Sequence, residues 1–140
     1  MDITIFHNAR CGTSCNTLAL IRNTGVEPQI VDYIAHPMAP EALAAMIAKA
    51  GLTVREAIRS KEPVFAELGL ADPALDDGAL LAAMVANPVL INRPFVVTCM
   101  AVRLCRPSEL VLDILTMPQL GAFTKEDGEA VVDASGKRIV

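Results

Sequence analysis

Apolar residues alternate with polar ones in short blocks that predict the first three elements of the chain. The apolar run at residues 2–6 predicts a strand, and residues 13–24 predict a helix. Gly25 follows as a helix stop, and residues 27–33 predict a second strand. Because a helix connects these two strands, we expect them to be parallel neighbours in one sheet.

The middle of the chain carries helical patterns only. Pro40 begins a predicted helix that runs to Ala50, and Gly51 ends it. The pattern stays helical to Ala86, which predicts an all-helical insertion over approximately residues 40–87. The breaks within it are Pro63, residues 69–73 and Asp76-Asp77, a pair that can cap the next helix.

Strand patterns return after the insertion. The apolar runs 89–91, 95–98 and 102–105 predict strands, and Ser108 is expected to cap a helix that runs through Leu115. The end of the chain predicts a hairpin, in which Val131-Val132-Asp133 and residues 137–140 flank a Ser-Gly turn. This order of elements predicts an α/β fold, a mixed sheet with helices on both faces.

Length and composition narrow the class of protein. A chain of 140 residues, 53% of them hydrophobic, is most simply one domain over residues 1–140. We expect no membrane association, because no apolar run is long enough for a span and the N-terminus does not resemble a signal peptide. The net charge of −4 argues against nucleic-acid binding. The expected location is cytoplasmic, where the thiols of the four cysteines stay reduced.

The stretch FHNARCGTSCNT, residues 6–17, carries the strongest candidate chemistry. Cys11 lies between the first predicted strand and the first predicted helix, so the helix dipole and free backbone N–H groups favour its thiolate. Gly12 allows a close backbone approach, and Thr13 and Ser14 add hydroxyl donors. The sequence therefore predicts a low-pKa nucleophile that coincides with an anion cradle.

Two residues near Cys11 leave alternatives open. His7, if protonated, would lower the pKa of the thiol further; equally, it is a strand-end histidine satisfied by the backbone. Cys15 lies one helical turn beyond Cys11, about 6 Å between Cα atoms. Side chains stacked on one helix face point the same way, which disfavours a disulfide and favours a half-buried helix residue.

Three arginines could surround an oxyanion. Arg93 precedes Pro94 between two predicted strands, and a cis Arg93-Pro94 bond would place the guanidinium over Cys11. Arg106 lies just before the predicted helix that begins at Ser108, and Arg59 lies within the helical insertion. Each alone would be a solvated surface arginine, but guanidinium groups bind oxyanions well where they converge. The remaining cysteines, Cys99 and Cys105, are expected in the core or in strands.

Four stretches together resemble the glutaredoxin-linked arsenate reductase family. They are FHNARCGTSCNTL, LINRPFVVT, RLCRPSELVLDIL and GAFTKEDGEAVVD, and they span essentially the whole chain. The resemblance implies a thioredoxin-like mixed sheet with an all-helical insertion and a C-terminal extension. It also implies reduction of arsenate to arsenite for arsenic detoxification, with glutathione as co-substrate, glutaredoxin as partner, and no bound cofactor or metal.

The resemblance also assigns roles to the candidate residues. The essential cysteine of the family falls on Cys11, and its histidine near the active cysteine falls on His7. The cis proline falls on Pro94, and the anion-binding arginines fall on Arg59, Arg93 and Arg106. With Gly12, Thr13 and Ser14 as the cradle, these residues form the expected site.

One departure from the family motif and two rival functions remain. Cys15 stands where the family commonly has arginine, and Arg10 is a candidate to replace that charge. The first rival is a general thiol–disulfide or deglutathionylating protein, which would not need three arginines. The second is a regulator of the same fold that acts on RNA polymerase, but that regulator typically has Cys-x-x-Cys, which is absent here.

Overall fold

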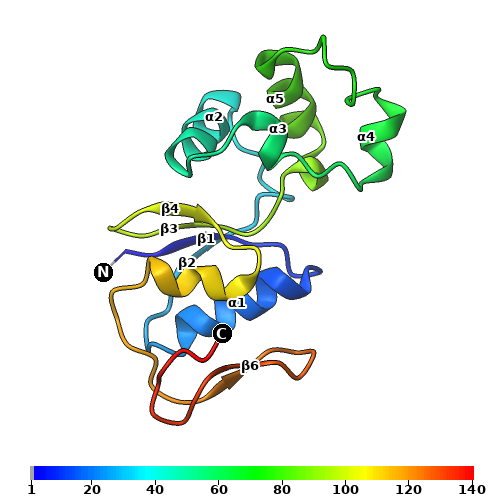
Figure 1. Ribbon diagram of the computed structural model, residues 1–140. Coiled ribbons are helices and arrows are strands. Elements are labelled where there is room, and N and C mark those ends of the chain that lie inside the picture. Colours follow the sequence, from blue (N-terminus) through cyan, green and yellow to red (C-terminus); the bar gives the residue numbers. More distant parts are fainter. Residues whose placement is uncertain (1) are drawn as a thin grey trace. The chain divides into compact units, whose positions relative to one another are not determined.

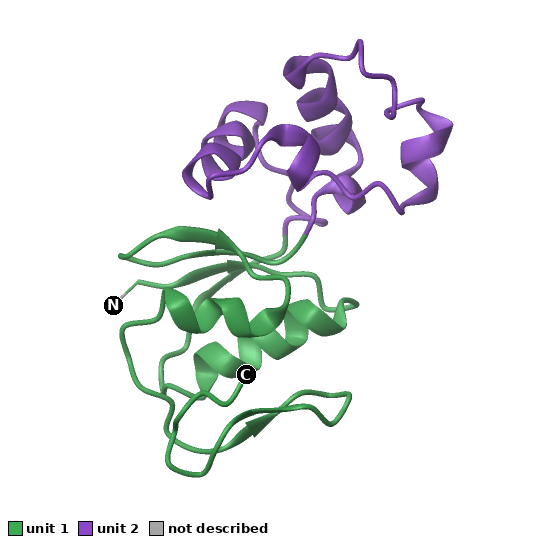
Figure 2. Ribbon diagram, in the orientation of Figure 1, with its two compact units in different colours: residues 1–32, 93–140 green, residues 33–92 purple. Residues whose placement is uncertain are grey.

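The computed structural model describes residues 2–140, which form two compact units (Figure 2). Unit 1 contains the residues up to 32 and residues 93–140, and unit 2 contains residues 33–92. The predicted helical insertion lies within unit 2. That the two units act as a single domain over 1–140 stays a prediction.

Unit 1 is built on a four-stranded mixed sheet with the strand order β2-β1-β3-β4. Strands β1 (Thr4–Phe6) and β2 (Gln29–Val31) are parallel, as predicted from the helix that connects them. Strand β3 (Phe95–Val97) runs antiparallel to both β1 and β4 (Val102–Leu104). Phe6 at the end of β1 therefore lies beside Phe95 at the start of β3, in the centre of the sheet.

Two helical elements cover one face of this sheet. Helix α1 (Gly12–Arg22) and the 3-10 helix η2 (Ser108–Asp113) lie side by side in Figure 1 and share one core with the sheet. That core includes Ile5 from β1, Ile21 from α1 and Val96 from β3, all fully buried. Within unit 1, α1 and η2 lie on the same face of the sheet. The other face would have to be covered by the helical insertion, so the expectation of helices on both faces stays a prediction.

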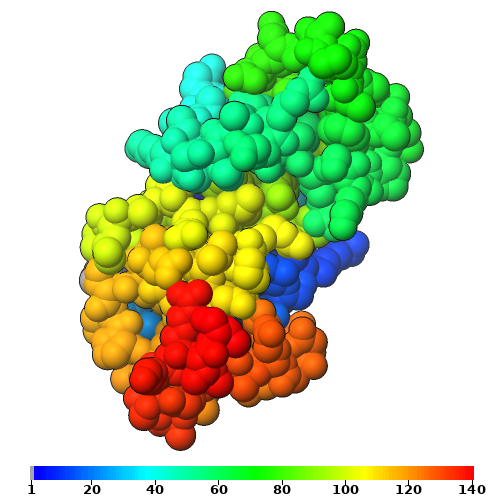
Figure 3. All heavy atoms as spheres, viewed as in Figure 1, coloured from blue at the N-terminus to red at the C-terminus, as the bar shows by residue number. Residues whose placement is uncertain are grey.

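The C-terminal extension forms a second, two-stranded sheet. Strand β5 (Phe123–Thr124) pairs antiparallel with β6 (Ala130–Val132), a pairing that the sequence analysis missed because β5 is only two residues long. The predicted turn at Ser135-Gly136 is confirmed, and Val132 bridges Arg138 across it. Figure 3 shows this segment, orange to red, at the surface of unit 1.

Unit 2 consists of helices, as predicted. Its elements are α2 (Pro40–Lys49), α3 (Val54–Ala57), α4 (Pro63–Glu67), α5 (Asp77–Ala86) and the 3-10 helix η1 (Pro88–Leu90). Pro40 and Pro63 begin α2 and α4, and the Asp76 carboxylate caps α5 by accepting the backbone N–H of Ala79 at 2.8 Å. Leu43, Leu80 and Met84 are fully buried in this unit.

Two sequence-based expectations about local structure were wrong. Residues 89–91 form no strand, because Pro88 begins a 3-10 turn and only Ile91 makes an isolated bridge to Ile58. Ser108 does not cap η2, since it is the first residue of that helix and Pro107 occupies the cap position. Its buried hydroxyl has no hydrogen-bond partner among the described residues.

Candidate active site

Cys11 lies where the loop after β1 enters α1. It occupies the N-cap position of α1 in an extended conformation, with φ −97° and ψ 118°, and its side chain is buried. The first backbone N–H groups of a helix lack intrahelical partners, and the dipole is positive at this end. The predicted placement of Cys11 at a helix N-terminus, beside the exposed Gly12, is thus what the structure shows.

The loops that precede β3 and follow β4 bring two arginines to the sulfur. Arg106 Nη1 lies 3.7 Å from Cys11 Sγ and donates a hydrogen bond of 3.1 Å to the Arg93 carbonyl oxygen. Arg93 also hydrogen-bonds the Cys11 thiolate. The Arg93-Pro94 bond is cis, as the sequence analysis expected, and so is Arg106-Pro107. Antiparallel pairing of β3 and β4 explains why residues thirteen apart meet.

These neighbours decide the charge state of Cys11. Burial alone would raise the pKa of the Cys11 thiol, because a low-dielectric environment disfavours the charged form. The backbone N–H of Ser14 and the guanidinium groups of Arg93 and Arg106 outweigh burial, so the pKa lies below its ordinary value. The predicted low-pKa thiol is confirmed, and its charge partners are Arg93 and Arg106 rather than the exposed Arg10.

His7 contacts the Ser14 side chain. His7 Nδ1 lies 2.7 Å from Ser14 Oγ, and the same hydroxyl oxygen accepts the Asn8 backbone N–H at 3.1 Å. Burial, and then the positive charge of Arg22, lower the pKa of His7, while Asp32 partly opposes them. These effects favour the neutral imidazole, and a role for His7 in tuning Cys11 stays a prediction.

The Ser14 hydroxyl, predicted as a donor in the anion cradle, hydrogen-bonds with other residues of the same loop. The Ser14 side chain is fully buried, and its hydroxyl is engaged by His7 and Asn8, so it holds the loop in place. Only the backbone N–H of Ser14 faces the Cys11 sulfur. No sequence pattern indicated this, because the pairing depends on the path of the loop. The half-buried Thr13 accepts a hydrogen bond from the Thr17 hydroxyl through its carbonyl oxygen, at 2.8 Å.

The other cysteines are free thiols in less reactive positions. Cys15 is half-buried, as favoured from the sequence, and its thiol donates to the Ala9 carbonyl oxygen at 3.4 Å. Burial, then the negative charges of Glu126 and Cys11, raise the pKa of Cys15. Burial likewise raises the pKa of the core residue Cys105 to about 12. Cys99 is exposed in the turn between β3 and β4, so its expected buried position was wrong.

Arg59 belongs to unit 2, whereas Cys11, Arg93 and Arg106 belong to unit 1. Its backbone N–H donates to the Leu90 carbonyl oxygen at 2.7 Å, and its guanidinium pairs with Glu62 at 2.9 Å. A role for Arg59 at the oxyanion therefore stays a prediction. Within residues 2–140, no group of three or more His, Cys, Asp or Glu side chains is arranged to hold a metal ion.

Fold and site together define a thioredoxin-like protein whose single low-pKa cysteine faces an arginine pair across a cis-proline loop. Residues 6–114 match the model of the ArsC family, and the chain belongs to that family. None of the helices in residues 2–140 is long and apolar enough to cross a membrane.

The relatives cover the chain from end to end. It is 62% identical to the arsenate reductase of Rhizobium meliloti (strain 1021) over 140 residues, 100% of each chain. It is 51% identical to the arsenate reductase of Escherichia coli (strain K12) over 138 residues, 99% of this chain and 98% of the other. The solved arsenate reductase from Vibrio cholerae superposes with a TM-score of 0.79 at 43% identity, covering 82% of this chain and 98% of that one.

Proposed function

We propose that this protein is an arsenate reductase that converts arsenate to arsenite in the cytoplasm, with glutathione and glutaredoxin as electron donors. The observation that carries the proposal is the Cys11 thiol with its lowered pKa, held against Arg93 and Arg106 at the start of α1. The names of the full-length relatives give the substrate.

In the first step, the Cys11 thiolate attacks the arsenic of bound arsenate. A sulfur–arsenic bond forms, an arsenic–oxygen bond breaks, and the oxygen leaves as water after protonation. Arg93, Arg106 and the N–H groups of residues 12–14 stabilise the charge on the oxyanion, a contribution that is usually large in such reactions. Arg59 would add a third guanidinium, as the family resemblance implies.

Two external thiols then supply the two electrons. Glutathione displaces a second oxygen as water and forms its own sulfur–arsenic bond. A glutaredoxin thiolate attacks the glutathione sulfur, so a disulfide forms, and the electron pair of the broken sulfur–arsenic bond stays on arsenic, which becomes As(III). Water then releases arsenite and restores the Cys11 thiol.

The remaining thiols of the chain support an external electron source. Cys15 has a raised pKa, Cys99 is exposed in a turn, and Cys105 is buried with a pKa of about 12. A protonated thiol is a poor nucleophile, so neither Cys15 nor Cys105 is suited to resolve an adduct on Cys11. The reduced cytoplasmic pool of small thiols is therefore the natural donor.

The test is an arsenate-dependent NADPH-consumption assay coupled through glutaredoxin and glutathione. We expect Cys11→Ser to abolish turnover and Cys15→Ser to keep most of it at saturating glutathione, with the exposed Cys99→Ser as matched control. Loss of activity in Cys15→Ser would instead indicate an internal Cys11–Cys15 disulfide. Turnover of mixed disulfides without arsenate would favour a deglutathionylating protein.

A further inference from the structure

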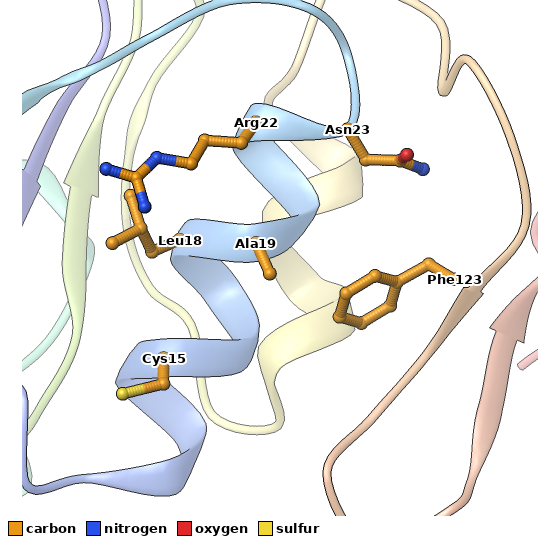
Figure 4. Close-up of a pocket in the computed structure, with 6 residues that line it drawn as sticks. All are labelled: Cys15, Leu18, Ala19, Arg22, Asn23 and Phe123. Atoms are coloured by element: carbon orange, nitrogen blue, oxygen red, sulfur yellow. The ribbon is translucent and has the colours of Figure 1, made fainter.

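An open pocket of about 530 Å³ lies in unit 1 along the exposed face of α1 (Figure 4). Leu18, Ala19 and the Phe123 ring form its apolar wall, and Arg22 and Asn23 lie at its far end. Its near end is at Cys15, one helical turn from Cys11. The volume suits a small molecule, since ligand pockets commonly measure about 300–1,000 Å³.

The two walls of the pocket are tied together at both ends. Asn23 Nδ2 donates to Gln119 Oε1 at 2.7 Å and to the Gly121 carbonyl oxygen at 2.9 Å, which fixes the chain before β5. At the other end, the Glu126 backbone N–H donates to Asn16 Oδ1 at 3.2 Å. The pocket is thus a preformed groove between α1 and the C-terminal hairpin, which lowers the cost of ordering a ligand.

An acidic residue lies at the end of the groove nearest to Cys11. Glu126 Oε2 lies 3.4 Å from the position that a Cβ on Gly12 would take, next to the nucleophile in the sequence. Its charge also raises the pKa of the adjacent Cys15, which places the carboxylate within electrostatic reach of the groove. This carboxylate would repel an oxyanion but attract an ammonium group.

A basic residue lies at the other end. The Arg22 guanidinium uses Nε and Nη2 for a two-pronged ion pair with Glu27, at 2.8 Å for each contact. Because a guanidinium has five N–H donors, its remaining donors can bind a second carboxylate. From Gly12 to Arg22 the helix rises about 15 Å.

We propose that this groove is the glutathione site of the reductase, with the ammonium group at Glu126, the glycine carboxylate at Arg22 and the cysteinyl sulfur directed at the adduct on Cys11. The inference rests on the proposed function. An extended tripeptide spans about 11 Å, which is somewhat less than the helix rise of about 15 Å from Gly12 to Arg22, so the two charged side chains are placed near the two ends of such a ligand. A contact between the ammonium group and Glu126 also explains why one acidic residue borders an otherwise anion-binding site.

The first experiment measures binding without chemistry. S-methylglutathione, which has no free thiol, is titrated into the ¹⁵N-labelled wild-type protein, and backbone amide shifts are followed by NMR. We expect saturable shifts at Leu18, Ala19, Phe123 and Glu126. Absence of saturation, or shifts confined to other parts of the chain, would overturn the assignment whether or not arsenate is the substrate.

The second experiment measures donor kinetics. Arg22→Gln and Glu126→Gln should each raise the KM for glutathione about 5- to 10-fold, since each removes one charged contact to the donor. Arg22→Gln should leave the KM for arsenate unchanged, whereas Glu126→Gln, which removes a negative charge beside Gly12, should not raise it. Ala19→Phe, which fills the groove, should behave like Arg22→Gln. Matched controls are Arg103→Gln and Glu129→Gln, which remove an ion-paired arginine and a hairpin carboxylate outside the pocket.

The outcomes separate the two proposals. If the wild type turns over arsenate but all three pocket variants keep the KM for glutathione, the groove assignment is wrong and the reductase proposal stands. If the wild type shows no arsenate-dependent turnover, the proposed function fails, and the NMR titration still decides the pocket. Should Ala19→Phe not fold, the two charge variants decide alone.

Discussion

At the scale of single residues, the reactivity of Cys11 depends on a balance between burial and nearby positive charge. Burial opposes the thiolate, whereas the Ser14 N–H, Arg93 and Arg106 favour it, and the favourable groups win. His7 contacts the Ser14 hydroxyl through Nδ1, and its lowered pKa favours the neutral imidazole. Removing one guanidinium should therefore shift the titration of Cys11 measurably.

We predict that Arg106→Gln raises the pKa of Cys11. At any pH near the pKa the thiolate fraction then falls, so the pH profile of alkylation by iodoacetamide moves to higher pH. The expected rate at pH 7 is about 3- to 10-fold lower, the size of roughly one lost charge-assisted contact. The measurement is the rate of Cys11 alkylation against pH, followed by peptide mass spectrometry.

Arg103→Gln is the matched control, since Arg103 is paired with Asp113 at the surface of β4. Its profile for Cys11 should coincide with that of the wild type. An unchanged profile in Arg106→Gln would mean that Arg106 does not stabilise the thiolate.

At the scale of elements, one lysine links the C-terminal hairpin to η2 within unit 1. Lys125 pairs with Glu109 of η2 at 2.8 Å and with Glu129 at 2.6 Å, and the Lys125 and Glu109 side chains are only 11% exposed. Figure 3 shows the hairpin, in orange, beside the blue residues that begin the chain. This anchor places Phe123 and Glu126 against α1.

We predict that Lys125→Met lowers the free energy of unfolding at pH 7 by about 1–2 kcal/mol, because two carboxylates lose a hydrogen-bonded partner. Burial would raise the pKa of Glu109, but hydrogen bonding to Lys125 outweighs it and the pKa is lowered. The stabilisation is therefore present above the unfolded-state pKa and is lost as the pH falls through the folded-state value. Urea unfolding at pH 7 and at pH 3 measures both effects.

Between pH 7 and pH 3, the free energy of unfolding should fall further in the wild type than in Lys125→Met. Equal losses would show that the ion pair adds nothing to stability. Arg22→Gln, which breaks a fully exposed ion pair, provides a comparison that is expected to change the free energy of unfolding less than Lys125→Met does.

Two glycines of the hairpin region form a matched pair for a second element-scale prediction. Gly128 and Gly136 both have a positive φ, at 95° and 84°. A Cβ on Gly128 would meet open space, whereas one on Gly136 would collide with the Gln119 carbonyl oxygen. Alanine at either position pays for the backbone conformation, but only Gly136→Ala adds a collision with backbone.

We therefore predict that Gly128→Ala costs about 1 kcal/mol and Gly136→Ala at least about 2–3 kcal/mol, measured by urea unfolding. Gly136→Ala should also weaken the packing of the preceding Gln119 loop, seen as faster hydrogen exchange at Leu120, whose N–H donates to Asn23. Equal costs for the two variants would contradict the collision.

At the scale of the whole molecule, each unit has a core of its own. Leu80 is fully buried in unit 2 and Val96 is fully buried in unit 1. If the chain is a single domain, as the sequence predicts, a cavity in either core should destabilise the same transition.

We predict that calorimetry shows one thermal unfolding transition, and that Leu80→Ala and Val96→Ala each lower its midpoint temperature. The expected cost is about 2–5 kcal/mol for Leu80→Ala and somewhat less for Val96→Ala, because the cavity scales with the deleted volume. The exposed Leu68→Ala is the control and should change little. A second transition that appears in one variant only would show that the units unfold separately.

Much of the fold followed from local signals in the sequence. Pro40 and Asp76 began helices where expected, and the strand–helix–strand order alone required β1 and β2 to be parallel. The errors at residues 89–91 and at Ser108 share a cause. Both lie at the start of a 3-10 helix, which Pro88 begins in one case and Pro107 precedes in the other. Short apolar runs do not distinguish such a helix from a strand or a capped α-helix.

The sequence by itself determined where the nucleophile lies and why its thiol ionises, since a cysteine before a helix N-terminus is a local arrangement. Only the tertiary structure decided which groups surround Cys11. Antiparallel pairing brings Arg93 and Arg106 to one sulfur, burial favours a neutral His7 beside Ser14, and the hairpin brings Phe123 and Glu126 to α1. Contacts across 95 or more residues depend on how the chain packs, and no local pattern encodes that packing.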